Sequence, residues 1–247
     1  MKRVVVVGAT SGIGRAVAAE YLRRGWHVGV VGRDRAKVER VVGELRAEPG
    51  GVVEGAVGDV ASPEDVEAAF REILVALGQM DLLVYCAGVN PAEATTHDRI
   101  REVGPILDVN VRGCVHWLER GAEYLEPLGR GRLAAVGSMA GVRGRRGHPV
   151  YGASKAALHE YLEGLRHRLH GTGVGVTTVV PGWVRTPMLD EATARSPAAI
   201  DVERAARIIV RGLERGRDLF HVPGWWALVA LGLRGLPRWL YKRIAPP

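Results

Sequence analysis

The sequence has little cysteine, little lysine and few aromatic residues, and these shortages narrow the classes of protein to which it can belong. Only two cysteines occur among the 247 residues, Cys86 and Cys114, and both lie in apolar surroundings. We therefore expect buried thiols in a reducing compartment rather than a disulfide or a metal site. No cluster of His, Cys and Asp predicts a metal centre. No apolar run reaches the ~20 residues needed to span a bilayer, so the sequence does not predict a transmembrane protein.

Runs of basic residues are also absent, although the net charge is +7. The positive charge is spread along the chain without interleaved aromatic residues, so we expect a solvated basic surface and no nucleic-acid partner. Nearly all the basic residues are arginine, which sets apart the few lysines, Lys155 among them. The first residues lead directly into a glycine loop rather than a secretory apolar core. We therefore expect no signal peptide and a cytoplasmic protein.

Short apolar runs alternate with segments of helical spacing along most of the chain. The runs at residues 4–7, 27–31, 52–57, 81–86, 133–136 and 174–180 predict strands, and residues 13–24, 35–47, 63 onward, 96–125 and 150–170 predict helices between them. Gly25 is expected to end the first helix, and Ser62 to cap the third. This alternation implies a single-domain α/β fold, a doubly wound (Rossmann) parallel sheet with helices on both faces. We assign residues 1–222 to this domain and residues 223–247 to a C-terminal tail.

A cluster of glycines joins the first expected strand to the first expected helix. Residues 8–14 read Gly-Ala-Thr-Ser-Gly-Ile-Gly. Glycine permits a tight turn and a close approach of backbone to a pyrophosphate, and the helix N-terminus behind it offers free N–H groups and partial positive charge. A purely structural turn is the alternative, but the position after an N-terminal strand favours phosphate binding. The candidate contacts are Gly8, Thr10, Ser11, Gly12, Ile13 and Gly14.

A second group of residues can handle a proton. Tyr151 and Lys155 are four residues apart on an expected helix and therefore share a face. An ammonium stabilises the phenolate form of a nearby tyrosine, which suits proton exchange with a carbonyl or alcohol oxygen; the alternative is an aromatic ring packed on a lysine stem. Ser138 ends the fifth expected strand, where its hydroxyl can bind a substrate oxygen. Asn110, between two valines, is either a satisfied core residue or a holder of water for a proton relay.

The order of these pieces, G-x-x-x-G-x-G, then Asn110, Ser138 and Tyr-x-x-x-Lys, resembles the short-chain dehydrogenase/reductase family over nearly the whole chain up to about residue 222. The resemblance implies a catalytic tetrad and a homodimer or homotetramer. The tetrad is Asn110, Ser138, Tyr151 and Lys155, of which Asn110, Tyr151 and Lys155 also contribute to the cofactor site. Further implied cofactor contacts are Asp59 and Val60 at the adenine, Ala87 and Gly88 after the fourth strand, and Pro181, Gly182, Val184 and Thr186 near the nicotinamide. Cys86 stands where the family usually has Asn, a departure that we expect to loosen a local backbone bond without abolishing binding.

Cofactor choice depends on the end of the second strand. NAD enzymes of this type place an acid there, whereas this sequence has Gly32 followed by Arg33. A small residue removes repulsion, and a guanidinium can pair with the 2′-phosphate of NADP. Asp34 comes next and, if turned inward, favours NAD. We predict that NADP(H) is preferred, with NAD(H) as the alternative.

Together these features predict an NAD(P)(H)-dependent oxidoreductase that interconverts a carbonyl and a secondary alcohol, with Tyr151 exchanging the proton. A catalytically silent NADP-sensing protein that binds partners through the same fold is the alternative, but it needs neither Tyr151 nor Lys155. Residues 188–200 are expected to form a flap over the site. Three arginines near the expected entrance, at positions 143, 145 and 146, either attract an acidic group or are solvated.

The C-terminal tail joins an apolar segment to a basic one. Residues 222–233 are almost entirely apolar and include Trp225 and Trp226, and four basic residues and Trp239 lie between positions 234 and 243. The tail can cover the substrate pocket, pack on a neighbouring subunit, or lie in a membrane interface as a peripheral contact. Each placement favours a lipophilic small-molecule substrate such as a ketone, a 3-oxoacyl or a steroid-like compound. A membrane-surface protein whose tail is its main feature is a further alternative.

Overall fold

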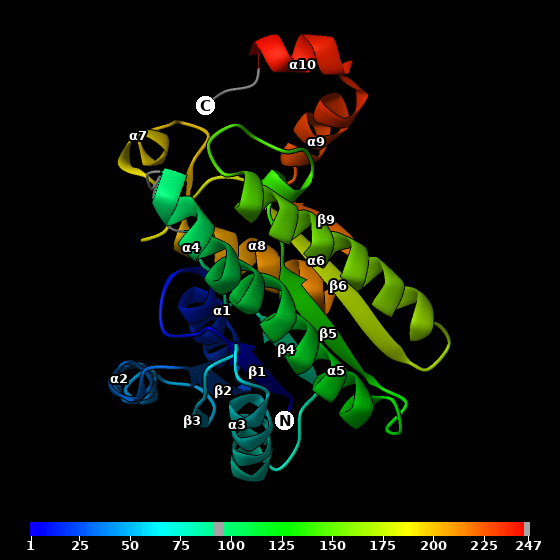
Figure 1. Cartoon of the computed structure of the whole chain (residues 1–247). Coiled ribbons are helices and arrows are strands. Elements are labelled where there is room, and N and C mark those ends of the chain that lie inside the picture. The colour runs from blue at the N-terminus through cyan, green and yellow to red at the C-terminus, as the bar shows by residue number, and fades with distance from the viewer. Residues whose placement is uncertain (91–95, 245–247) are drawn as a thin grey trace.

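The computed structural model describes residues 1–90 and 96–244, and its centre is a parallel sheet (Figure 1). Seven strands lie in the order β3-β2-β1-β4-β5-β6-β9, and each is parallel to its neighbours. They are β1 (Arg3–Val7), β2 (His27–Gly32), β3 (Val53–Val57), β4 (Leu82–Tyr85), β5 (Gly131–Val136), β6 (Val174–Pro181) and β9 (Leu219–Val222). The order reverses between β1 and β4, and in such folds ligands bind in the crevice at the carboxyl ends of the strands at this point.

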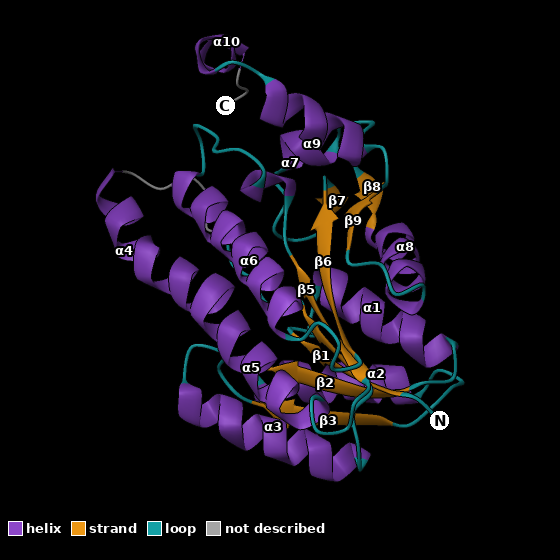
Figure 2. Ribbon diagram, turned by 90° about the vertical axis from the view of Figure 1, so that its right-hand side faces the viewer, coloured by secondary structure: helices purple, strands orange, loops and turns teal. Residues whose placement is uncertain are grey.

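Helices cover both faces of the sheet (Figure 2). On one face lie α1 (Gly12–Arg23), α2 (Arg35–Arg46) and α8 (Val202–Glu214), and on the other α3 (Pro63–Leu77), α5 (Gly113–Leu125) and α6 (Pro149–Arg168). The side chains of β1 explain why both faces need cover: Val4 and Val6 pack into the first layer, Val5 and Val7 pack into the second, and all four are fully buried. This arrangement confirms the predicted doubly wound α/β fold.

Two helices have the capping residues that the sequence predicts. Gly25 ends α1 as the residue after the C-cap Arg24, with φ +76°. The N–H of Gly25 donates to the Leu22 carbonyl at 2.8 Å, which satisfies one of the last carbonyls of the helix. At the start of α3, the hydroxyl of Ser62 accepts the N–H of Asp65 at 3.1 Å, as its predicted role as a cap requires.

The sequence prediction differs from the structure in the long helix 96–125 and in all elements after β6. The predicted helix 96–125 is α4 (Thr96–Leu107), a π-helical turn η1 (Asp108–Arg112) and α5, so a change of winding interrupts it. The prediction also lacks α8 and β9. The strand β9 has four residues, and His221 breaks its apolar run, so it is too short to be recognised by pattern alone.

The remaining elements lie beyond the carboxyl ends of the strands. Two short strands, β7 (Val184–Arg185) and β8 (Ile200–Asp201), pair with each other and flank α7 (Glu191–Ala194), which lies within the segment expected to form a flap. The tail forms α9 (Trp226–Gly235) and α10 (Arg238–Ile244) at one end of the molecule (Figures 1 and 2). In the described part of the chain, no helix is long and apolar enough to cross a membrane.

Candidate active site

The glycine loop lies against the end of β4. Gly8 has φ +80°, and a Cβ placed on it would lie 2.5 Å from the backbone nitrogen of Ala87. A Cβ on Gly14 would lie 2.3 Å from the carbonyl oxygen of Gly8. Both glycines are therefore needed for the backbone to fold this closely. A Cβ on Gly12 would lie 3.5 Å from the side chain of Thr186, so the segment after β6 reaches the same loop.

The first turn of α1 is open to an anion. Ser11 stands at the N-cap, but its side chain makes no capping hydrogen bond. No acidic residue lies in the first turn, so no carboxylate neutralises the positive end of the helix dipole. Thr10 and Ile13 flank this turn and are partly buried. These features fit a bound phosphate group.

The end of β2 carries the residues that bear on cofactor choice. Gly32 lies under Thr10, and a Cβ on Gly32 would be 2.6 Å from the Thr10 methyl group. The side chain of Arg33 is exposed. Asp34 caps α2 by accepting the N–H of Lys37 at 3.2 Å, and this bond is the main cause that lowers the pKa of the Asp34 carboxyl. The carboxylate is therefore held by its own helix, which argues against the inward position that would favour NAD.

Two further predicted contacts follow β3. Asp59 accepts the N–H of Ala61 at 2.9 Å, and Val60 is almost fully buried. A Cβ on Gly113 would lie 2.7 Å from the Val60 carbonyl oxygen, so α5 approaches this loop closely.

Val184, a further predicted contact, lies on β7. Its side chain is buried in the core beside Ile200, and only its main chain is left to contact a cofactor.

Cys86 directly follows β4 and is a neutral thiol that is only partly buried, whereas the sequence predicted full burial. Burial raises its pKa to about 12, against the opposing effect of the positive charge of Lys155. The expected loosening of the backbone does not extend to the sheet bond, because the N–H of Cys86 donates to the Val7 carbonyl at 2.8 Å. Cys114 is fully buried, as predicted, and neither cysteine forms a disulfide.

Lys155 is buried beside the end of β4. Its side chain is only 4% exposed, and Nζ donates to the carbonyl of Val136 at 3.1 Å. Nζ lies 5.9 Å from the centre of the Tyr151 ring, so the two side chains share one face of α6. A Cβ on Gly88 would lie 3.4 Å from this Nζ and 3.3 Å from Oδ1 of Asn110. Lys155 and Asn110 therefore meet at the same small residue.

Asn110 joins three parts of the site. Its Oδ1 accepts the N–H of Val89 at 2.8 Å, and its Nδ2 donates to the Val89 carbonyl and to Oγ of Ser154, both at 3.0 Å. Ser154 in turn donates to the Tyr151 carbonyl at 2.7 Å. Asn110 is thus a satisfied, fully buried residue of the π-helical turn that fixes the β4 loop relative to α6. The contribution of Ser154 was not predicted from the sequence.

Ser138 stands at the end of β5 in extended conformation. Its hydroxyl accepts the N–H of Ala140 at 3.1 Å and so caps a short 3₁₀ turn, η2 (Met139–Gly141). Its own N–H donates to Nε2 of His159 at 3.4 Å. His159 lies one turn beyond Lys155 on α6, and sequence reasoning missed it because nothing in the Tyr-x-x-x-Lys pattern singles out the next turn.

The tail covers the part of the molecule next to Ser138. Trp226 and Ala230 of α9 pack with Met139 and Val180 in a buried apolar cluster. A Cβ on Gly182 would lie 2.0 Å from Nε1 of Trp226, so the indole lies directly on this segment. Although Trp226 is only 5% exposed, its Nε1 has no hydrogen-bond partner among the described residues.

Arg143 secures the tail. Its guanidinium donates to the carbonyls of Leu233 and Leu236, the latter at 2.6 Å, and lies 4.0 Å from the centre of the Tyr241 ring. Tyr241 also donates to the Gly144 carbonyl at 2.8 Å. Both bonds come from Nη1, so one nitrogen of the guanidinium anchors Arg143 to the carbonyls at the end of α9.

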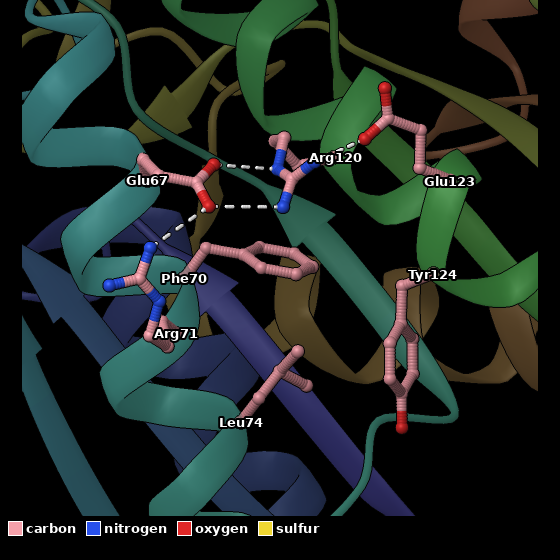
Figure 3. A pocket seen from close by; sticks show the side chains of 7 residues that line it. All are labelled: Glu67, Phe70, Arg71, Leu74, Arg120, Glu123 and Tyr124. Atoms are coloured by element: carbon pink, nitrogen blue, oxygen red, sulfur yellow. Dashed lines mark hydrogen bonds and ion pairs between the residues drawn. The ribbon is translucent and has the colours of Figure 1, made fainter.

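A separate hollow of about 360 Å³ lies between α3 and α5 (Figure 3). The guanidinium of Arg120 lies between the carboxylates of Glu67 and Glu123, with the Glu67 contact at 2.8 Å, and Arg71 pairs with Glu67 at 3.4 Å. Phe70 lines its floor, with the Arg120 guanidinium 5.7 Å from the ring centre. Its charged groups are paired with each other, and no predicted site residue lines it. We interpret it as a groove of helix packing.

Known proteins resemble this chain in sequence and in fold. A family model described as short chain dehydrogenase matches residues 2–197. An uncharacterized oxidoreductase from the mprA 5′ region of Streptomyces coelicolor is 35% identical over 246 residues, which is 98% of this chain and 96% of that protein. The crystal structure of an actinorhodin polyketide ketoreductase variant with NADPH has a TM-score of 0.81 and 26% identity, covering 91% of this chain and 96% of its own.

A second solved structure shows the same likeness with a different cofactor. A short-chain dehydrogenase/reductase from Burkholderia phymatum in complex with NAD has a TM-score of 0.80 and 26% identity, covering 92% of this chain and 91% of its own. The two solved neighbours therefore bind the two forms of nicotinamide dinucleotide. Because the family model spans most of the sequence and the relatives are oxidoreductases, the chain belongs to the short-chain dehydrogenase family of oxidoreductases.

Proposed function

We propose that the protein moves a hydride between a nicotinamide dinucleotide and the carbon of a carbonyl or secondary alcohol, with Tyr151 exchanging the proton. The observation that carries the proposal is the position of Lys155. It is a buried ammonium that shares a helix face with Tyr151, and its hydrogen bond within the described chain goes to one main-chain carbonyl. An ammonium has three donors, and burying it with only one of them used is costly. Ribose hydroxyls of a dinucleotide would satisfy the others.

Each residue of the proposed tetrad has a distinct task. When bound, the nicotinamide supplies or accepts the hydride at the substrate carbon. Tyr151 gives its phenolic proton to the oxygen in reduction and takes it back in oxidation, and Lys155 stabilises the phenolate. Ser138 holds the substrate oxygen through its hydroxyl. Asn110 holds the loop after β4 against α6, a role that its three side-chain hydrogen bonds support.

NADP is the cofactor that the end of β2 supports best. Arg33 is exposed directly after β2, and a guanidinium binds phosphate with paired donors. Gly32 offers no carboxylate to a ribose hydroxyl. Asp34 is engaged as the cap of α2. These three features favour NADP(H) over NAD(H).

A lipophilic substrate is supported by the surroundings of Ser138. Met139 follows Ser138 directly and packs against Val180 and the tail residues Trp226 and Ala230. We infer that this inner face of α9 forms an apolar wall of the substrate pocket. A ketone, a 3-oxoacyl or a steroid-like compound would match such a wall. A solved relative named as a polyketide ketoreductase is in line with a ketone. Nothing at the site favours a silent cofactor sensor.

The test uses Tyr151→Phe, which removes the phenolic oxygen and keeps the ring. We expect NADPH binding, followed by its fluorescence, to stay within about twofold, while turnover falls by about 100-fold or more, the usual contribution of general acid–base catalysis. Turnover is read as absorbance of the reduced nicotinamide over a panel of ketones, 3-oxoacyl thioesters and steroids. Tyr124→Phe, in the hollow between α3 and α5, is the control. Unchanged turnover in Tyr151→Phe would contradict the proposal.

The proposal also includes the oligomeric state of the protein. Membership of the family leads us to propose a homodimer or homotetramer, and sedimentation velocity at several protein concentrations measures it directly. A monomer at all concentrations would contradict this part of the proposal and leave the chemistry of Tyr151 unaffected.

A further inference from the structure

The tail exposes four large apolar side chains to solvent. We name this surface the outer tail face and define it by Trp225, Leu228, Leu231 and Trp239. Their exposed fractions are 45%, 74%, 70% and 63%. Leu228 and Leu231 are three residues apart on α9 and therefore neighbours on one side of the helix. Solitary exposed leucines are ordinary, but four large apolar residues gathered on one short segment mark an interaction surface.

The same segment carries only positive charge. After Asp218 the sequence has no Asp or Glu at all. Four cations follow on α9 and α10, all of them exposed: Arg234, Arg238, Lys242 and Arg243. The guanidinium of Arg243 lies 5.9 Å from the centre of the Trp239 ring, so basic and aromatic groups are interleaved. Elsewhere the chain mixes both signs, as the ion pairs along its helices show.

The tail is held firmly on its inner side. Trp226 lies on Gly182, and Arg143 holds the end of α9 through two carbonyls. Tyr241 ties α10 to Gly144. Figures 1 and 2 both place α9 and α10 at one end of the molecule, with α10 outermost. The outer tail face is thus presented on a fixed support rather than on a loose end.

An exposed apolar face of this kind can bind either a second copy of the chain or a lipid bilayer, and the charge of the tail distinguishes between the two. In a symmetric dimer the same patch meets itself, so the interface would bring together two tail segments that each carry four cations, with no Asp or Glu after Asp218 to separate the like charges. An anionic bilayer instead attracts the cations and accepts tryptophan and leucine at the boundary of headgroups and acyl chains. We propose that the outer tail face docks the protein on the surface of an anionic lipid bilayer.

Docking in this way would place one helix between two apolar environments. The inner face of α9 packs beside Ser138 through Trp226, while its outer face would lie in the membrane interface. A substrate dissolved in the bilayer would then have a short path to the site; this consequence alone rests on the proposed function. The docking itself does not depend on catalysis, and the experiment below measures it without turnover.

The experiment is flotation of the full chain with vesicles of phosphatidylcholine alone and of phosphatidylcholine with phosphatidylglycerol at a ratio of about 7:3. We expect the wild type to float with the anionic vesicles and not with the neutral ones. Removing three charges in R238Q/K242Q/R243Q should lower the partition coefficient about 100-fold, because each basic residue near an anionic surface contributes about a factor of five. L228S/L231S should lower it about tenfold or more for each leucine lost from the interface.

Matched controls distinguish docking through the outer tail face from non-specific binding to the vesicles. R204Q/R207Q/R211Q removes three exposed arginines from α8, and Leu128→Ser removes an exposed leucine from the turn before β5. Both controls should float as the wild type does. Circular dichroism checks the fold of each variant, and NADPH turnover on a water-soluble ketone reports the proposed function independently.

Three results would overturn the proposal. The first is a wild type that does not float with the anionic vesicles. The second is equal loss of flotation in the α8 arginine control and the α10 variant, which would show binding by net charge alone. The third is an L228S/L231S variant that floats like the wild type but sediments as a smaller species, which would make the outer tail face a subunit interface. Normal flotation without any turnover would contradict the proposed function and leave the docking proposal unaffected.

Discussion

Nε2 of His159 accepts a hydrogen bond from the backbone N–H of Ser138 at 3.4 Å, which links α6 to the end of β5. The contact depends on a glycine, because a Cβ on Gly137 would lie 2.3 Å from this nitrogen. Only the neutral imidazole can accept at Nε2. Burial lowers the pKa of His159 to about 4, and the positive charges of Lys155 and Arg234, together with His221, act in the same direction. His159 is therefore neutral at pH 7, and we infer that it positions Ser138.

The positioning role predicts a specific response to substitution. His159→Leu removes the acceptor, so we expect kcat to fall about fivefold while the KM for NADPH is little changed, since one hydrogen bond contributes about 1 kcal/mol. His159→Gln can restore an acceptor and should recover most of the loss. The acid limb of the kcat profile near pH 4 should be present in the wild type and absent in His159→Gln, whose amide does not titrate. An identical acid limb in both would show that His159 acts only as a packing residue.

The same lowered pKa makes stability depend on pH. In the unfolded chain His159 takes up a proton near the ordinary histidine pKa of 6.5, whereas the folded chain resists protonation until about pH 4. The unfolded state therefore binds more protons between these values, and the free energy of unfolding should fall as the pH drops from about 6.5 to about 4. The loss due to this group is at most about 3 kcal/mol. Urea unfolding at a series of pH values, for the wild type and His159→Gln, measures it; equal slopes would contradict the prediction.

Arg33 should set the preference between the two dinucleotides. Arg33→Ala removes the proposed partner of the 2′-phosphate, and losing hydrogen bonds to a charged group costs about 1.5–3 kcal/mol. We therefore expect the ratio of kcat/KM for NADPH to that for NADH to fall roughly 10- to 150-fold, with the NADH value itself nearly unchanged. Arg40→Ala, which replaces an exposed arginine on the nearby helix α2, is the control. An unchanged ratio in Arg33→Ala would mean that another residue selects the cofactor.

Lys155 should stabilise the complex of the protein with NADPH and not the free protein. Its ammonium is buried and donates to the Val136 carbonyl within the described chain. Methionine has a similar length without the charge, so Lys155→Met should leave the melting temperature of the free protein unchanged or raise it by a few degrees, on the order of 1 kcal/mol. The rise in melting temperature on adding NADPH should be largely lost. Scanning fluorimetry with and without NADPH gives both values, and a large drop for the free variant would assign Lys155 to the core instead.

Local sequence patterns were enough to predict six of the seven strands of the sheet, most of the helices between them, and the shared helix face of Tyr151 and Lys155. The valines of β1 read as a strand buried on both faces, and they are fully buried. The glycine loop, Tyr151 and Lys155 follow short fixed spacings, so the secondary structure itself places them on the same edge or face. In each case the signal lies within a few residues of sequence.

The parts that the sequence could not predict depend on contacts between distant segments. The bond between Ser138 and His159 joins residues 21 apart in the chain, and that between Arg143 and Leu236 joins residues 93 apart. No local pattern encodes such a pairing. The π-helical turn that holds Asn110 has the composition of an ordinary helix, so only tertiary packing reveals it. The tail combines a feature that the sequence predicts with one that it does not. Its apolar character is evident in the sequence, but only the structure distinguishes its covered face from its exposed face.

The closeness of Trp226 to Gly182 gives a test of the inner face of the tail. In Gly182→Ala the new methyl carbon would lie 2.0 Å from Nε1 of Trp226, so the indole and with it α9 must move. We expect faster amide hydrogen exchange in α9, a loss of about 1–3 kcal/mol in the free energy of unfolding, and a larger rise in KM for a bulky ketone than for a small one. Gly224→Ala is the matched control, since a Cβ there meets no atom within 4 Å. If exchange in α9 and both KM values stay at the wild-type level in Gly182→Ala, the inner face of the tail does not line the substrate pocket.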